Sequence, residues 1–264
     1  MDNMILGRYI PGDSIIHRLD PRSKLMALIL LIVIIFWANN PVTNLLFFVM
    51  TGIFVGLSGI PLSFFIKGLR SMIFLIAFTT IFQLFFVSSG EILYEIGIVK
   101  ITSNGLEQAG IIFCRFVLII IFSTLLTLTT MPLSLATAVE ALLKPLKRFH
   151  IPVHEIGLML SMSLRFVPTL MDDTLRIMNA QKARGVDFGE GNIIQKVKAM
   201  IPILIPLFAS SLKRADSLAI AMEARGYQGG NDRSQYRQLS WRTRDSVALL
   251  LVSLLGGILF LLKS

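Results

Sequence analysis

The chain has 264 residues, of which 54% are hydrophobic and only 16% are charged. Soluble domains carry about 25% charged residues, so the composition argues against an ordinary water-soluble domain and indicates an integral membrane protein. The net charge of +9 lies in the gaps between long apolar runs. This is the usual positive-inside pattern of membrane proteins, and we therefore expect no nucleic-acid partner.

Five apolar runs predict five membrane-spanning helices in a lipid bilayer. A bilayer core of about 30 Å requires about 20 helical residues, and the second to fifth runs meet this length. The first run is short, but residues 23–40 can serve if Lys24 extends its side chain to the membrane edge. The runs cover residues 25–38, 42–60, 64–87, 109–131 and 246–262.

The orientation of the spans follows from the basic residues of the loops. The N-terminal segment carries Arg8, Arg18, Arg22 and Lys24, whereas the 88–108 loop is mainly acidic. Cytoplasmic loops are enriched in Lys and Arg. We therefore expect a multi-pass protein of the bacterial cell membrane with a cytoplasmic N-terminus and an external C-terminus.

The segment between the fourth and fifth predicted spans is basic and only intermittently apolar. We divide the chain into residues 1–131, with four spans, residues 132–241, on the cytoplasmic side, and residues 242–264, with the last span. The middle segment predicts a short helix over 133–148 and two long amphipathic helices, each with an apolar seam at helical spacing. The seam positions are Leu160, Leu164, Val167, Met171 and Leu175 in the first long helix and Ala215, Ala219 and Met222 in the second. We expect these seams to pack against another helix or a membrane partner, and the small alanines allow close approach.

Both long helices end in the same three-residue pattern. The first ends in Ala183-Arg184-Gly185, and the second ends in Ala224-Arg225-Gly226. One such ending is most simply a helix cap, because glycine accepts the left-handed conformation and a cation suits a helix C-terminus. Two such endings on one side of the membrane favour a second interpretation, in which each arginine fork docks into a partner protein.

Residues that would support catalysis or ion-driven transport are missing. The chain has no phosphate-binding G-x-x-x-x-G-K-[ST] motif, and no Asp or Glu lies inside a predicted span. His150 and His154 lack a metalloprotease pattern, and the single cysteine, Cys114, forms neither a disulfide nor a zinc site. The alternatives are a membrane-embedded enzyme acting on lipids, with Asp172 and Asp173 as the pair to suspect, or a scaffold without transport.

The N-terminal sequence from Tyr9 to Leu25, with its Leu-Asp-Pro-Arg-x-Lys core, resembles the opening signature of energy-coupling factor transporter T components. The paired endings look like the two X-Arg-X motifs of that family. The resemblance implies an all-α membrane subunit with two crossing coupling helices and no enzymatic activity or cofactor of its own. It also implies two ABC-type ATPase partners, which hold ATP and magnesium, docked at residues 183–185 and 224–226. A small membrane S component would bind the vitamin or metal ion and would contact the seams.

Overall fold

The computed structural model describes residues 9–86, 91–96, 99–149, 152–186, 188, 192–227 and 239–261. The chain forms two compact units, residues 1–142 together with 238–264, and residues 143–237. The N-terminal half and the C-terminal helix therefore share one unit, although they are far apart in the sequence. The predicted segment 132–241 extends beyond the second unit at both ends.

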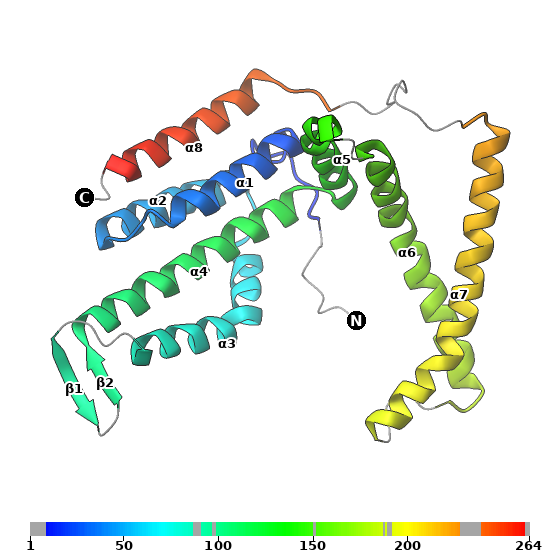
Figure 1. The fold of residues 1–264 in the computed structure, drawn as a ribbon, viewed down its shortest axis with the longest axis horizontal. Helices are drawn as coiled ribbons and strands as arrows, with labels where there is room; N and C mark the ends of the chain where they lie inside the picture. Colours follow the sequence, from blue (N-terminus) through cyan, green and yellow to red (C-terminus); the bar gives the residue numbers. More distant parts are fainter. Residues whose placement is uncertain are drawn as a thin grey trace. The chain divides into compact units, whose positions relative to one another are not determined.

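The first unit is a bundle of helices. Figure 1 shows α1, α2, α4 and α8 running alongside one another, with α1 in contact with α8 and α4, and α4 in contact with α2 and α3. The antiparallel hairpin of β1 (Ile92–Ile96) and β2 (Val99–Thr102), which the sequence did not predict, precedes α4. The helices of this unit are α1 (Pro21–Ile35), α2 (Pro41–Ser58), α3 (Leu62–Phe86), α4 (Ser103–Thr129), α5 (Pro132–Leu143), which ends at the unit boundary, and α8 (Thr243–Leu261).

The core of the first unit lies among α1, α2, α4 and α8. Phe47, Leu118 and Leu259 are completely buried there, together with residues of α1. A Cβ atom placed on Gly256 of α8 would lie 2.7 Å from Ile34 Cδ1 of α1. Real Cβ contacts are not this short, so a glycine at this position allows the two helices to approach closely. This close contact packs α8 against α1.

Five of the described helices are long and apolar enough to cross a membrane, namely α2, α3, α4, α7 and α8. Four of them correspond to the second to fifth predicted spans. The remaining one is α7, which the sequence predicted as a cytoplasmic helix. By contrast, α1 has 15 residues and is about 22 Å long, which is short for a span. The protein is thus an all-α integral membrane protein apart from the hairpin, and composition alone does not separate α7 from the spans.

The second unit contains the 3₁₀ helix η1 (Lys144–Phe149) and the long helices α6 (Val153–Ala183) and α7 (Ile193–Ala224). Figure 1 shows α6 and α7 crossing, and the two helices are in contact. The predicted helix over 133–148 is wrong as one continuous helix, because α5 ends at Leu143 and η1 follows. Pro145 explains the break, since proline has no N–H to donate and disfavours the α conformation in the preceding residue.

Candidate functional site

The two long helices end in matching hydrogen-bonded caps. Gly185 and Gly226 have φ angles of +86° and +72°, in the left-handed region that favours glycine. In each cap the glycine N–H donates to the carbonyl three residues earlier, and the next N–H donates to the carbonyl five residues earlier, at 2.8–3.0 Å. This is the Schellman arrangement, and it satisfies carbonyls that the helix end leaves open. The sequence repeat is therefore also a structural repeat.

The arginine side chains of these ends, which we call the arginine tips (Arg184 and Arg225), are exposed. Neither guanidinium has a hydrogen bond or an ion pair with any residue that the structure describes. Backbone amides already provide the capping bonds, so the arginine side chains are not needed to satisfy the helix ends. Each tip presents five N–H donors in a rigid fork, which suits carboxylate and carbonyl acceptors on a partner surface.

Ala183 and Ala224, which precede the tips, are also exposed. Because alanine is small, it leaves the aliphatic part of the neighbouring arginine side chain uncovered. The two endings therefore present the same surface, formed by alanine, arginine and glycine.

The predicted seam positions lie largely on open faces of α6 and α7. Val167 and Met171 are 49% and 51% exposed, although they are apolar. The remaining positions are exposed at Leu160, Ala215 and Ala219 and partly buried at Leu164, Leu175 and Met222. Within the described part of the chain, these faces are largely exposed, so they can contact an apolar partner.

One contact between α6 and α7 was missed by reasoning from the sequence. Arg214 Nη2 donates to Asp173 Oδ2 at 2.8 Å, and the Arg214 guanidinium lies 5.8 Å from the centroid of the Phe166 ring. In the sequence, Asp173 stands out only as the acidic neighbour of Asp172. The available signal was the spacing, because Asp173 and Arg214 are separated by 41 residues, the same interval that separates the two tips.

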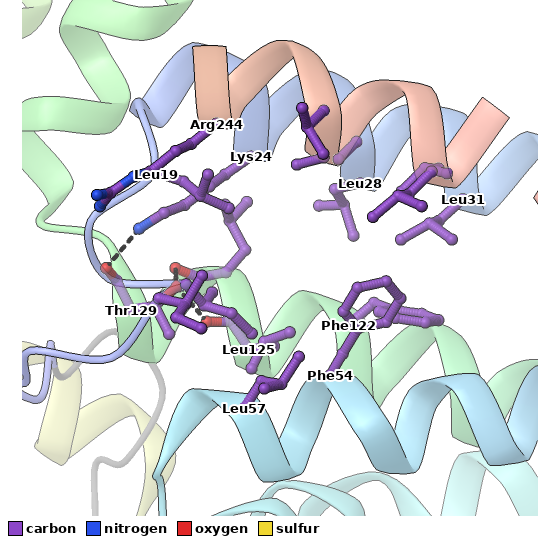
Figure 2. A pocket seen from close by; sticks show the side chains of 18 of the residues that line it. Leu19, Lys24, Leu28, Leu31, Phe54, Leu57, Phe122, Leu125, Thr129 and Arg244 are labelled. Carbon is purple, nitrogen blue, oxygen red and sulfur yellow. Dashed lines mark hydrogen bonds between the residues drawn. The ribbon is translucent and has the colours of Figure 1, made fainter. Parts of the chain in front are cut away.

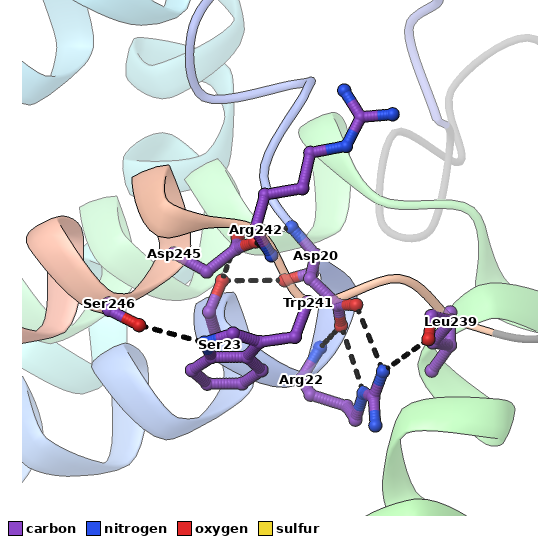
Figure 3. A network of polar contacts seen from close by, with 8 residues as sticks. All are labelled: Asp20, Arg22, Ser23, Leu239, Trp241, Arg242, Asp245 and Ser246. Carbon is purple, nitrogen blue, oxygen red and sulfur yellow. Dashed lines mark hydrogen bonds and ion pairs between the residues drawn. The ribbon is translucent and has the colours of Figure 1, made fainter.

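In the first unit, the Leu-Asp-Pro-Arg-x-Lys sequence forms a polar network with the start of α8 (Figure 3). Asp245 is 2% exposed and accepts hydrogen bonds from the Asp20 backbone N–H at 2.7 Å and from Ser23 Oγ at 2.9 Å. Its other oxygen accepts from the Arg242 backbone N–H at 2.8 Å. One buried carboxylate thus joins the starts of α1 and α8. We call this network the Asp245 clasp.

Arg22 extends the Asp245 clasp to the chain just before α8. Its guanidinium donates from Nε and Nη2 to the two carboxylate oxygens of Asp20, both at 3.2 Å, and Nη2 also donates to the Leu239 carbonyl at 2.7 Å (Figure 3). Asp20 also caps α1, because its carboxylate accepts from the Arg22 backbone N–H at 2.8 Å. The signature residues therefore hold together two helix starts that come from opposite ends of the chain.

His17 and Lys24 complete the signature. His17 Nε2 donates to the Ile10 carbonyl at 3.1 Å, and a hydrogen bond of 2.6 Å joins His17 Nδ1 to Ser14 Oγ. Burial lowers the pKa of His17, although the bond to Ile10 opposes this effect. Lys24 Nζ donates to the Thr129 carbonyl at 2.9 Å, at the C-terminal end of α4. The positive charge of Lys24 stabilises that helix end, because the last carbonyls of a helix have no partner within the helix.

An apolar cavity of about 390 Å³ lies in the first unit between α1, α2, α4 and α8 (Figure 2). Its lining is hydrocarbon at Leu28, Leu31, Phe54 and Phe122. Figure 2 shows the Lys24 amine turned toward Thr129 rather than left free in the cavity. The cavity has few polar groups with which to recognise a hydrophilic substrate.

The acidic residues and histidines that could take part in catalysis lie apart in the part of the chain that the structure describes. No group of three or more His, Cys, Asp or Glu residues could hold a metal ion in that part. Asp172 is exposed and Asp173 is paired with Arg214, so the two carboxylates do not form a shared acid–base site. His150 lies outside the described residues.

Comparison with known proteins assigns the family. Residues 12–236 match the family model of CbiQ, described as cobalt transport protein. The chain is 71% identical over 264 residues to the energy-coupling factor transporter transmembrane protein EcfT of Streptococcus equi subsp. equi, covering all of this chain and 98% of the relative. It is 47% identical to the protein of the same name from Bacillus subtilis, with complete coverage of both chains. The chain belongs to the CbiQ family and, within it, to the energy-coupling factor transporter transmembrane proteins.

Proposed function

We propose that this chain is the non-catalytic coupling subunit of an importer driven by two ABC-type ATPases. The observation that carries the proposal is the pair of exposed arginine tips, which end two crossing helices with the same cap. Two equivalent docking surfaces suit two similar partners. The names of the relatives place them in energy-coupling factor transporters, which supports an assembly powered by other chains.

In this proposal, each arginine tip enters a groove of one ATPase and binds acidic or carbonyl groups there. The ATPases hold ATP and magnesium, and this chain supplies no cofactor. Closing of the ATPase pair moves α6 and α7, and the movement reaches a small membrane S component that carries a vitamin or metal ion. The second unit and the N-terminus face the cytoplasm, so the ATPases meet the tips there, and the C-terminus lies outside.

The open apolar faces of α6 and α7 are the surface that we assign to the S component. Ile205 and Phe208 of α7 are 64% and 67% exposed, and Met171 of α6 is 51% exposed. Large apolar side chains that gather on one face mark partner or membrane surfaces. The predicted seam on α7, at Ala215, Ala219 and Met222, continues this face with mostly small residues that permit close helix packing.

The test is truncation of each arginine tip in the full transporter complex. If the tips acted only as favourable charges at helix ends, Arg184→Ala and Arg225→Ala would cost a few tenths to about 1 kcal/mol each and assembly would persist. If each tip is buried in an ATPase groove, its loss costs about 2–5 kcal/mol of docking. Two sites on one chain reinforce each other through effective concentration, so single variants are expected to assemble but couple poorly.

The double variant is expected to lose both the ATPases and uptake. Arg176→Ala and Lys213→Ala are matched controls, because they remove exposed cations from the same two helices away from the tips. Copurification of the ATPases and substrate uptake in proteoliposomes are measured for all variants, with folding checked by chromatography in detergent. A well-folded double variant with normal ATPase association and uptake would show that the tips are only caps.

A further inference from the structure

The ion pair between α6 and α7 occupies a special position relative to the arginine tips. Asp173 precedes Arg184 by the same interval by which Arg214 precedes Arg225. At a rise of about 1.5 Å per residue, each tip is about 16 Å, or about three helical turns, along its helix from the ion pair. The helix segments between the ion pair and the tips, which we call the arms (residues 173–184 and 214–225), therefore have equal length.

The ion pair joins equivalent positions of the repeat that relates α6 to α7. Asp173 and Arg214 are equivalent in the repeat that relates the two helix ends, and their side chains meet at 2.8 Å. The two helices therefore contact each other at matching points of the repeat. Two identical charges at such a position would repel each other, whereas opposite charges attract. The two copies of the repeat therefore carry opposite charges at the position where they meet.

The surroundings of Arg214 hold the contact in one geometry. Its guanidinium lies near the Phe166 ring as well as the Asp173 carboxylate, so two groups of α6 position it. The side chains of Arg214 and Asp173 are 30% and 20% exposed. Arg214 Nη1 is buried and has no hydrogen-bond partner within the described part of the chain. Removal of the carboxylate would leave the guanidinium partly buried without an anion.

We propose that Asp173 and Arg214 form the pivot of α6 and α7, a pair of positioning residues that keeps the two arms equal while the ATPases move the tips. This inference rests on the proposed coupling function. The pivot does not touch ATP or substrate. Its loss lets α6 and α7 slide or rotate against each other, so ATP hydrolysis continues while less of the movement reaches the S component.

The first test measures the geometry of this chain alone. Spin labels at Lys182→Cys and Glu223→Cys, which are exposed and equivalent in the repeat, report the distance between the two ends in a Cys114→Ser background. We expect one narrow distance distribution, which broadens at least twofold with Asp173→Asn or Arg214→Gln. Asp172→Asn and Lys213→Gln, at exposed neighbouring positions, are matched controls that leave the distribution narrow. An unchanged distribution in both pivot variants would overturn the proposal.

The second test measures coupling in the complete transporter. Asp173→Asn and Arg214→Gln are expected to retain the ATPases and lower substrate uptake per ATP at least fivefold. The charge exchange Asp173→Arg with Arg214→Asp is expected to restore at least half of the wild-type ratio. Wild-type coupling in the single variants, or no recovery in the exchange, would overturn the pivot. Broadened distances together with ATPase binding that is independent of the arginine tips would instead refute only the proposed function.

Discussion

The most informative stability prediction concerns Asp245→Ala, which removes the carboxylate at the centre of the Asp245 clasp. The substitution leaves the backbone N–H groups of Asp20 and Arg242 without their acceptor, whereas the Ser23 hydroxyl keeps the Asp20 carbonyl at 2.8 Å. Asp20 and Ser23 are buried, with 6% and 1% exposure, so water does not readily replace the lost acceptor. The starts of α1 and α8 would then be held together by apolar packing and by the hydrogen bond from Arg22 to the Leu239 carbonyl.

The magnitude follows from the charge and the burial of the group. A hydrogen bond to a charged group contributes about 1.5–3 kcal/mol, and a buried donor left without its acceptor costs about 1–3 kcal/mol. Because the three donors share one carboxylate, their contributions do not add fully. With two backbone donors left unsatisfied, we expect a loss of about 3–5 kcal/mol in the free energy of unfolding. At about 2–4 °C per kcal/mol for a chain of this size, the loss corresponds to roughly 6–20 °C in Tm.

The assay is thermal unfolding of the purified chain in detergent, followed by chromatography or intrinsic fluorescence. Asp245→Asn keeps one oxygen acceptor and is expected to lose about half as much as Asp245→Ala. Asp216→Ala removes an exposed carboxylate from α7 and is the matched control. A Tm for Asp245→Ala within about 2 °C of both wild type and control, less than the shift expected for 1 kcal/mol, would refute the reasoning that this carboxylate stabilises the bundle.

Three further outcomes are expected. In a Cys114→Ser background, a membrane-impermeant maleimide should label Glu91→Cys in intact cells but not Lys144→Cys, and labelling of Lys144→Cys would reverse the orientation. The purified chain should not hydrolyse ATP, because it contains no phosphate-binding motif, and turnover without partners would contradict a coupling role. The pKa of His17 is lowered in the folded state, so the stability it contributes is present above pH 6.5 and is lost as the pH falls through the folded pKa. Thermal unfolding between about pH 7.5 and pH 5 should therefore show a smaller acid-induced fall in Tm for His17→Gln than for wild type, and equal slopes would contradict this.

Much of this protein is encoded in local sequence. Runs of apolar residues determine α2, α3, α4 and α8 because a helix is the way for one segment to satisfy its own backbone in a bilayer. The ends of α6 and α7 were predictable for a similar reason, since Gly185 and Gly226 act within one turn of their own helix. The same local reasoning failed at Pro145, where proline divides the predicted short helix, and at the hairpin before α4.

The tertiary structure decided the contacts between distant residues. Asp245 lies 225 residues from Asp20, and no periodicity relates the two positions. Composition likewise does not separate α7 from a membrane span, because exposed apolar side chains look the same whether they face lipid or a partner. The repeated Ala-Arg-Gly pattern predicted two equivalent ends, but only the crossing of α6 and α7 brought Asp173 and Arg214 together. Local propensity acts over one or two turns, whereas these contacts depend on how whole helices approach one another.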